Sequence, residues 1–268
     1  MALNQCMRST DRNGPIPEAS GTPVGVLGRT LALLESFRNT DASLTLAELS
    51  RRTGLPKATV HRMTAEMRRE HMLEQLDDGS YRLGLRLFEI GERVHSHRSL
   101  SQAALPIMED LREATRQRIH LAVLEGVDVV YVEILGANLL RQIGSRTGGR
   151  FPAHATGVGK AILAYSPVAV VRARIDAGLE RVTPRTITTP GALQRELQEI
   201  RTKGFAQDRE ESHVGVSCVA AAAFGSDSKV RAALSITGRT TSIDPARLGP
   251  AIRIAANTLS RALRESHL

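Results

Sequence analysis

The segment TLAELSRRTGLPKATVHRMTAEMRR, from Thr45 to Arg69, decides the fold of the N-terminal part of the chain. It predicts two short helices joined by a tight turn. Thr45 can cap the first helix, and Glu48, three residues later, can reach back to the capping residue. Gly54 supplies a left-handed residue to end that helix, and Pro56 suits the start of the next. The pattern is that of a helix-turn-helix.

The second of these helices has two chemically different sides. Val60, Met63 and Met67 recur at helical spacing and form an apolar stripe, while the opposite side is polar and basic. Between Arg51 and Arg69 the chain has six Lys or Arg residues against one acid. A helix in the major groove of DNA needs this division. A helical hairpin with a solvated basic side would explain the charge, but not its coincidence with the cap, the glycine and the proline.

The flanking segments predict the rest of an N-terminal domain. Residues 1–23 are polar and contain several Gly and Pro residues, which predicts a flexible tail. A helix over about 27–37 follows. Its residues Leu27, Leu31 and Leu34 share one face, and we expect that face to complete a three-helix core.

Two short strands are predicted after the second helix. Residues 73–76 and 81–83 flank Asp78-Gly79, a dipeptide typical of hairpin turns. Three helices and a hairpin make a winged helix-turn-helix, which we place at residues 24–84. The residues expected to contact DNA lie on the helices and the wing: Thr45, Arg51, Lys57, Ala58, Thr59, His61, Arg62, Ser80 and Arg82. Arg62 is the candidate for a bidentate contact with guanine, and contacts to phosphate alone are the alternative.

The remaining chain predicts a linker and a second domain. Residues 85–98 are expected to form a linker helix that also packs against its copy in a dimer, and residues 99–268 an effector-binding and oligomerisation domain. A helix is predicted over about 101–116, and two more around 190–203 and 248–263. The predicted strands cover residues 119–124, 129–135, 139–143, 205–208, 216–224 and 230–237. Helices that flank a mostly antiparallel sheet define an α+β domain.

The amino-acid composition limits the kinds of partner and cofactor that the protein can have. The 268 residues carry a net charge of +8, which fits a polyanionic partner, although residues 1–86 hold only 12 Lys/Arg against 10 Asp/Glu. The absence of Trp and an aromatic content of 3% argue against stacking on single-stranded bases. Cys6 and Cys218 give neither a zinc-ligand set nor a disulfide framework, so we expect no cofactor. Without a membrane-spanning apolar run or a secretory signal, we expect a cytoplasmic protein with no membrane partner.

Several stretches together carry a resemblance to a known family. They are LAELSRRTGLPKATVHRM, YRLG, PAHATGVGKAILA, RTIT, KGFAQDREESHVGVSC and AALSITG. In this order the chain resembles an IclR-family transcriptional regulator from about Val24 to Leu263. The resemblance implies a winged helix-turn-helix, a linker helix and a GAF-like α/β effector domain with a mostly antiparallel sheet. It also implies a homodimer or dimer of dimers that binds double-stranded operator DNA and responds to a small organic acid. Two positions depart from the family pattern: Ala222, where a Pro is common, and Ala58, where a Ser is common.

The resemblance also implies an effector pocket, lined by Gly157, Val158, Asp208, Cys218, Ser235 and Thr237. These residue types suit an organic acid. Gly157 opens a helix, where free N–H groups and the helix dipole favour a carboxylate. Ser235 and Thr237 lie two apart on one strand and therefore face the same side, and Asp208 can accept from a ligand hydroxyl. Arg141, Arg150 and His154 are weaker candidates for recognition of the acid.

Catalytic alternatives have less support. The GVGKA segment imitates a phosphate loop, but His154 stands where that loop needs Gly and Ala161 where it needs Ser or Thr. The acids Asp208, Glu210 and Glu211 predict a solvated loop. We therefore expect a regulator, with a repressor favoured over an activator, and not an enzyme. A metabolite-binding or enzymatic C-terminal module and an architectural DNA-binding protein without effector remain alternatives.

Overall fold

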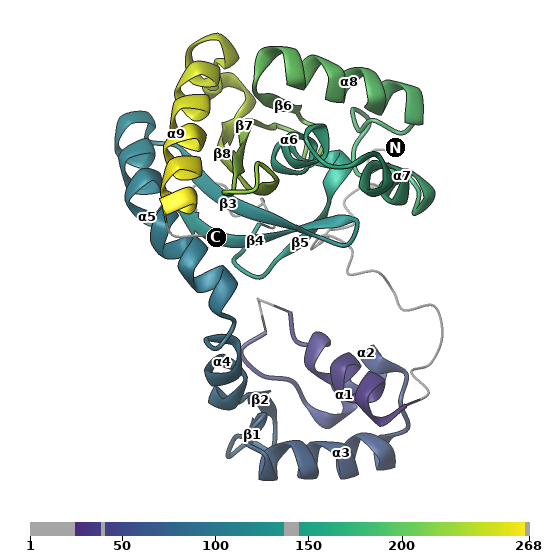
Figure 1. Cartoon of the computed structure of the whole chain (residues 1–268). Helices are drawn as coiled ribbons and strands as arrows, with labels where there is room; N and C mark the ends of the chain where they lie inside the picture. Colours follow the sequence, from purple (N-terminus) through teal and green to yellow (C-terminus); the bar gives the residue numbers. More distant parts are fainter. Residues whose placement is uncertain (1–24, 39–40, 137–144, 266–268) are drawn as a thin grey trace, which may run out of the picture. The chain divides into compact units, whose positions relative to one another are not determined.

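A computed structural model describes residues 25–38, 41–136 and 145–265 (Figure 1). The chain divides into two compact units, one ending at His95 and the other beginning at Ser96. The predicted tail at 1–23 and the predicted strand at 139–143 lie outside the described residues. None of the described helices is long and apolar enough to cross a membrane.

The N-terminal unit is a winged helix-turn-helix, as predicted. Its elements are α1 (Val26–Glu35), α2 (Leu46–Thr53), α3 (Lys57–Arg69), β1 (Leu73–Gln75), β2 (Tyr81–Leu83) and α4 (Leu85–Gly91). The strands β1 and β2 pair antiparallel. The Thr45 hydroxyl accepts from the Glu48 N–H at 3.2 Å, and Gly54 ends α2 with φ +69°. The Glu48 carboxylate, however, accepts from Arg51 and Arg52 rather than closing a capping box.

The face of α1 that packs into the core differs from the prediction. Leu33 is fully buried and the predicted Leu34 packs against the same core, whereas Leu27 and Leu31 are 73% and 48% exposed. The helix carries leucines on two faces, so periodicity alone could not choose between them. Leu33 joins a core of residues from the helices and the hairpin: Leu44, Leu49, Leu55, Val60, Met63, Met67, Leu73 and Tyr81.

The break after the winged domain also lies elsewhere than expected. Sequence periodicity predicted one helix to about residue 97 and another from 101, but α4 ends at Gly91 and α5 spans His95–Thr115. Gly is a poor helix former, which favours a stop at this position. Pro106 therefore lies inside α5 and not near its start.

The C-terminal unit contains a six-stranded antiparallel sheet in the order β5-β4-β3-β8-β7-β6. The strands are β3 (Arg118–Glu125), β4 (Asp128–Leu135), β5 (Arg150–Pro152), β6 (Ala206–Arg209), β7 (Val216–Phe224) and β8 (Val230–Arg239). The boundaries of β7 agree with the prediction, while β5 and the helix α7 (Val168–Asp176) were not predicted.

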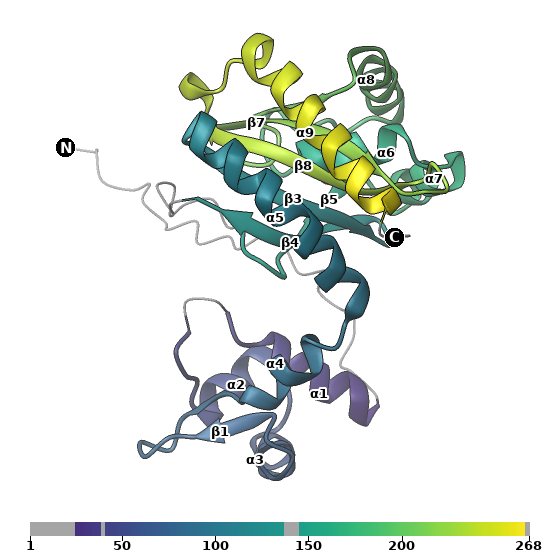
Figure 2. The same cartoon turned by 60° about the vertical axis from the view of Figure 1, so that its left-hand side comes forward.

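Helices cover both faces of this sheet (Figure 2). The helices α5 and α9 (Pro245–Glu265) pack on one face, and α6 (Gly157–Ala164) and α8 (Pro190–Lys203) lie on the other. Because both faces are covered, all but the last residue of β7 are buried. Alternate strand residues therefore point into two separate cores, and the core on the α6 side contains the site described next.

Candidate functional site

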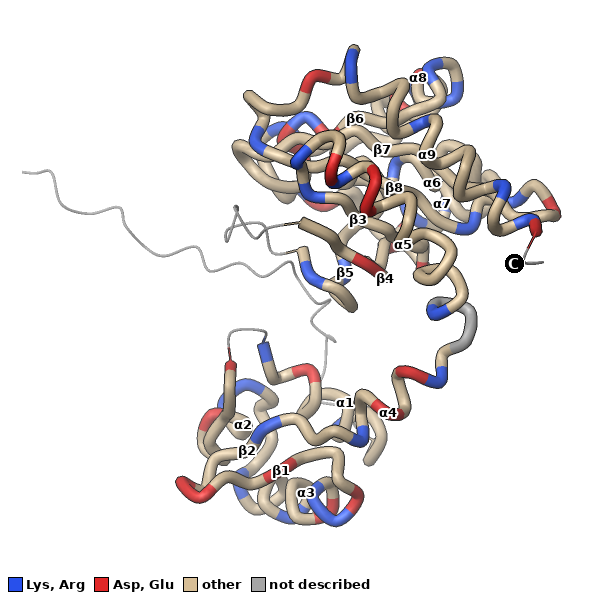
Figure 3. The backbone as a smooth tube through the Cα atoms, turned by 90° about the vertical axis from the view of Figure 1, so that its left-hand side faces the viewer, with Lys and Arg blue, Asp and Glu red and all other residues tan. Residues whose placement is uncertain are grey.

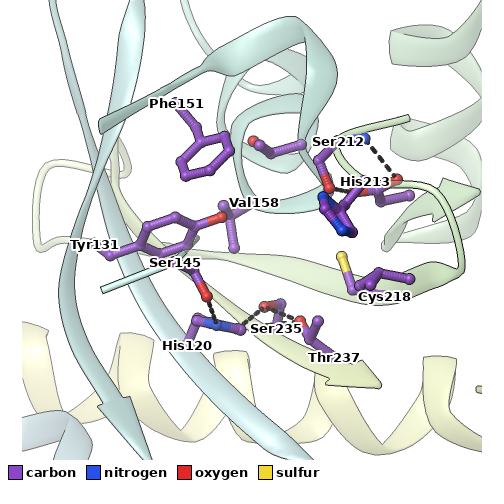
Figure 4. A pocket seen from close by; sticks show the side chains of 14 residues that line it. His120, Tyr131, Ser145, Phe151, Val158, Ser212, His213, Cys218, Ser235 and Thr237 are labelled. Carbon is purple, nitrogen blue, oxygen red and sulfur yellow. Dashed lines mark hydrogen bonds between the residues drawn. The ribbon is translucent and has the colours of Figure 1, made fainter. Parts of the chain in front are cut away.

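A cavity of about 30 Å³ lies between the sheet and α6 (Figure 4). Its lining comes from six strands, the start of α6 and two connecting segments: His120, Tyr131, Ser145, Phe151, Thr156, Gly157, Val158, Asp208, Ser212, His213, Val216, Cys218, Ser235 and Thr237. All six residues predicted for the effector pocket are among them. The other eight were not predicted.

Strand register brings the polar residues of the sheet together. His120 on β3 pairs with Ser235 on β8, and Cys218 on β7 pairs with Thr237. Because successive side chains alternate across a strand, these four residues point to the α6 side of the sheet. Their neighbour Ile236 points into the opposite core.

His120 organises a buried hydrogen-bond network. Its Nδ1 lies 3.1 Å from the Thr237 hydroxyl and 3.3 Å from that of Ser235, and its Nε2 lies 3.0 Å from the Ser145 hydroxyl. Burial lowers the pKa of His120 to about 3, with a smaller contribution from Arg118, so the ring is neutral at physiological pH. A neutral ring has one donor and one acceptor nitrogen, which orients the hydroxyls around it.

The first turn of α6 lies directly against the sheet. Thr156 caps the helix, since its hydroxyl accepts from the Gly159 N–H at 3.0 Å. A Cβ on Gly157 would lie 2.4 Å from the Cys218 Sγ, and one on Gly159 would lie 2.2 Å from the Ala153 carbonyl oxygen. Only glycine allows so close an approach. This close approach leaves the first N–H groups of α6 beside the cavity, where they favour an anion.

Asp208 is buried and already hydrogen-bonded. Its Oδ1 accepts from the Glu211 N–H at 2.7 Å, and its Oδ2 accepts from the Ser212 hydroxyl at 2.5 Å. Burial raises the pKa of Asp208, against the effect of these hydrogen bonds. A ligand hydroxyl that approaches Asp208 therefore has to compete with Ser212.

Two weaker candidates for acid recognition do not line the cavity. His154 is buried, and its Nε2 donates to the Glu180 carbonyl oxygen at 3.0 Å. Arg150 is exposed and donates to the Glu125 carbonyl oxygen. Arg141 lies outside the described residues. Among the described lining residues none is Lys or Arg, so an acid at this site would depend on N–H and O–H donors.

The prediction of a solvated acidic loop was wrong. Asp208 and Glu211 are each 3% exposed. The Glu211 carboxylate accepts from the ammonium group of Lys160, which is itself fully buried, and this pairing accounts for an acid in the interior. No cluster of His, Cys, Asp or Glu within the described ranges could hold a metal ion.

The candidate DNA surface lies on α3 and the wing (Figure 3). Val60, Met63 and Met67 are buried as predicted. The predicted contact residues at the start of α3 are exposed, apart from half-buried Thr59: Lys57, Ala58, His61 and Arg62.

Other predicted DNA contacts have protein partners. Arg51 forms two hydrogen bonds with Glu48, and Arg82 pairs with Glu74 across the hairpin at 2.6 Å. Thr45 is exposed but serves as the helix cap. The burial of Ser80 contradicts the prediction that its side chain contacts DNA. Ser80 is only 4% exposed, and its hydroxyl donates to the Asp78 Oδ1 at 2.6 Å. Its short side chain stabilises the turn and does not face solvent.

Replacement of Gly157 tests the close approach of α6. In Gly157→Ala the new methyl group collides with the Cys218 Sγ, and overpacking of this kind costs about 1–3 kcal/mol. Removal of the sulfur in Gly157→Ala/Cys218→Ala should recover most of that loss, because the next contact lies at 3.5 Å. Urea unfolding followed by circular dichroism measures the coupling. Strictly additive effects of the two substitutions would contradict the contact.

Neutral His120 predicts a pH dependence of stability. The unfolded state binds a proton below pH 6.5, whereas the folded state resists it down to a pKa of about 3, so stability is lost as the pH falls through this range. At pH 4.5 the loss from His120 is about 2–3 kcal/mol relative to pH 7. His120→Asn should show a correspondingly smaller difference between urea unfolding at pH 7 and at pH 4.5. An unchanged difference would show that His120 is not the group that titrates.

The comparisons with known proteins agree with this architecture. Residues 26–77 match the IclR helix-turn-helix domain, and residues 91–261 match the domain described as bacterial transcriptional regulator IclR C-terminal. The HTH-type transcriptional regulator XynR of Escherichia coli is 33% identical over 240 residues, covering 88% of this chain and 95% of XynR. The transcriptional repressor IclR of Escherichia coli is 31% identical, covering 83% and 82% of the two chains.

Solved structures give the same result. An IclR homologue from Microbacterium hydrocarbonoxydans, crystallised in complex with 4-hydroxybenzoate, superimposes with a TM-score of 0.79 at 31% identity. The match covers 90% of this chain and all of the homologue. With both domains matched in order and a cavity at the predicted residues, this chain belongs to the IclR family of transcriptional regulators.

Proposed function

We propose that this protein is a sequence-specific repressor whose binding to operator DNA is controlled by a small organic acid. The observation that carries the proposal is the cavity, which brings together Gly157, Val158, Asp208, Cys218, Ser235 and Thr237 in a chain that also has an exposed recognition helix. Relatives of this chain are named as transcriptional regulators, which favours this function over catalysis. A cavity with converging polar groups favours it over a purely architectural role.

The cavity suits an acid that is recognised by neutral donors. The N–H groups at Gly157 and Val158 would hold the carboxylate, and the Ser235 and Thr237 hydroxyls would donate beside it. The rings of Tyr131 and Phe151, which meet edge to face at 5.9 Å, would form an apolar wall. An aromatic wall and polar floor favour a flat hydroxy acid. The bound 4-hydroxybenzoate of the Microbacterium relative is such a molecule.

The proposed DNA contacts divide into base-reading and backbone-binding groups. Arg62 is exposed on α3, where a bidentate contact with guanine would contribute about 1–3 kcal/mol of base discrimination. Lys57, Thr59 and His61 would contact phosphates or base edges beside it. Arg82 would exchange its pairing with Glu74 for a phosphate, since an exposed ion pair stabilises by only about 0–1 kcal/mol.

We also propose that the protein acts as a homodimer or a dimer of dimers. Exposed apolar side chains lie on the described parts of α1, α4 and the segment after α4: Val26, Leu27, Leu31, Leu85, Phe88, Ile90 and Val94. So many large apolar groups on one small unit are typical of a protein–protein interface. A second copy of this unit would cover them. The proposed division of the chain is a DNA-binding domain at 24–84, a linker at 85–98 and an effector domain at 99–268.

A footprint on the DNA upstream of the protein's own gene and its neighbours tests the function. At near-physiological salt with competitor DNA, we expect protection of a two-fold symmetric site whose occupancy changes with one member of a panel of organic acids that includes 4-hydroxybenzoate. Arg62→Ala should flatten relative affinities across operator variants, with losses of about 10- to 100-fold at the best site. The exposed Arg69→Ala, from the end of α3, is the control. Protection that is only salt-sensitive and non-specific would contradict the proposal.

A further inference from the structure

The loop formed by residues 210–215, between β6 and β7, is one wall of the cavity. Ser212 and His213 line the cavity from this loop, and Figure 4 shows the His213 ring beside Cys218. Glu210 and Gly215, at the two ends, have positive φ angles of 65° and 80°. The chain therefore turns sharply on leaving β6 and again before it enters β7.

The cavity is too small for an aromatic acid such as 4-hydroxybenzoate unless a wall moves. A volume of about 30 Å³ has room for about two water molecules. The sheet wall is fixed by strand pairing, and the α6 wall is fixed by the contacts at Gly157 and Gly159. The 210–215 loop lies outside the strand pairing, so it can move without breaking a strand pair of the sheet.

Side chains from the surrounding elements hold this loop in place. Asp208 accepts from Glu211 and Ser212, as described above. The hydroxyls of Thr183 and Thr186 donate to the carbonyl oxygens of Glu210 and Glu211, each at 2.7 Å. All of these are hydrogen bonds between small groups. At the two ends of the loop, Arg185 lies 3.9 Å from the Glu210 carboxylate, and the Thr240 N–H donates to the Gly215 carbonyl oxygen at 3.1 Å. A buried ion pair is a further attachment.

That ion pair joins the loop to α6. The Lys160 ammonium donates to both carboxylate oxygens of Glu211, at 2.6 and 2.8 Å, and to the Glu196 carboxylate on α8 at 3.0 Å. Lys160 has no exposed surface, so the contact is shielded from water. It lies one turn of helix beyond Gly157, and the helix that presents its first N–H groups to the cavity thus also fastens the loop that closes it.

We propose that the Lys160–Glu211 ion pair is a latch that holds the 210–215 loop over the cavity and limits the entry of the effector. Lys160 and Glu211 are positioning residues, since neither lines the cavity. On entry, a ligand hydroxyl takes the place of the Ser212 hydroxyl at Asp208, and the loop leaves its ion pair as Ser212 moves away. The proposal rests on the effector function proposed above.

Two carboxylates on one ammonium group give a matched pair of variants. Glu211→Gln and Glu196→Gln each remove one of the two carboxylate charges that pair with Lys160, but only Glu211 belongs to the loop. In both variants an amide oxygen can still accept a hydrogen bond from Lys160, which favours correct folding. Glu211→Asp keeps the charge on a shorter side chain and serves as a second variant, with thermal unfolding as the check on folding.

The thiol of Cys218 reports on the loop without any ligand. It lies in the cavity, and burial raises its pKa, so it reacts slowly with alkylating reagents while the loop is closed. In a Cys6→Ser background, iodoacetamide should alkylate Glu211→Gln about tenfold faster than the parent, because hydrogen bonds to charged groups are the strongest of those that hold the loop. Glu196→Gln should remain within about twofold of the parent, and Glu211→Asp should be intermediate.

Stopped-flow binding then relates the latch to the effector. 4-Hydroxybenzoate should associate about tenfold faster with Glu211→Gln than with the parent or with Glu196→Gln. The reason is the same as for alkylation, since the loop opens more often when the ion pair is lost. Equal alkylation rates in the parent and Glu211→Gln, or equal acceleration in both Gln variants, would overturn the latch. If 4-hydroxybenzoate binds none of the proteins, the proposed effector is wrong, and the alkylation rates still decide on the latch.

Discussion

The close packing of α6 against the sheet is the constraint on which the effector unit depends. Gly157 allows the helix to approach the sheet to a distance that a single methyl group would prevent, and Gly159 allows an equally close contact with the backbone of Ala153 just before the helix. This approach fixes where the helix begins and therefore where its first N–H groups lie. It also fixes where Lys160 emerges one turn later. Anion recognition and attachment of the 210–215 loop thus follow from one packing contact.

The sequence predicted local structure well because local structure depends on neighbouring residues. The cap at Thr45, the turn at Gly54 and the stripe through Val60 are signals within about one helical turn, and all three agree with the structure. The effector residues came from the family resemblance, and the strand register explains why they meet: Cys218 and Thr237 are direct partners on adjacent strands.

The errors share a different physical origin, since each concerns a choice made by distant residues. Leu33 rather than Leu31 is buried because the rest of the core selects one of two leucine faces. Glu211 is buried because Lys160, 51 residues away in sequence, neutralises it. His120 belongs to the cavity because of its partners on β8 and at Ser145. No period or short motif in a single sequence encodes such pairings.

The two edges of the sheet bear on how copies of this chain can associate. The edge strands β5 and β6 have only three and four residues, and β5 ends in Pro152, which has no N–H to offer. Short edges that contain proline are poor templates for another strand, so the sheet resists extension from one molecule into the next. For the described strands, this lowers the tendency of the sheet edges to pair with those of another copy.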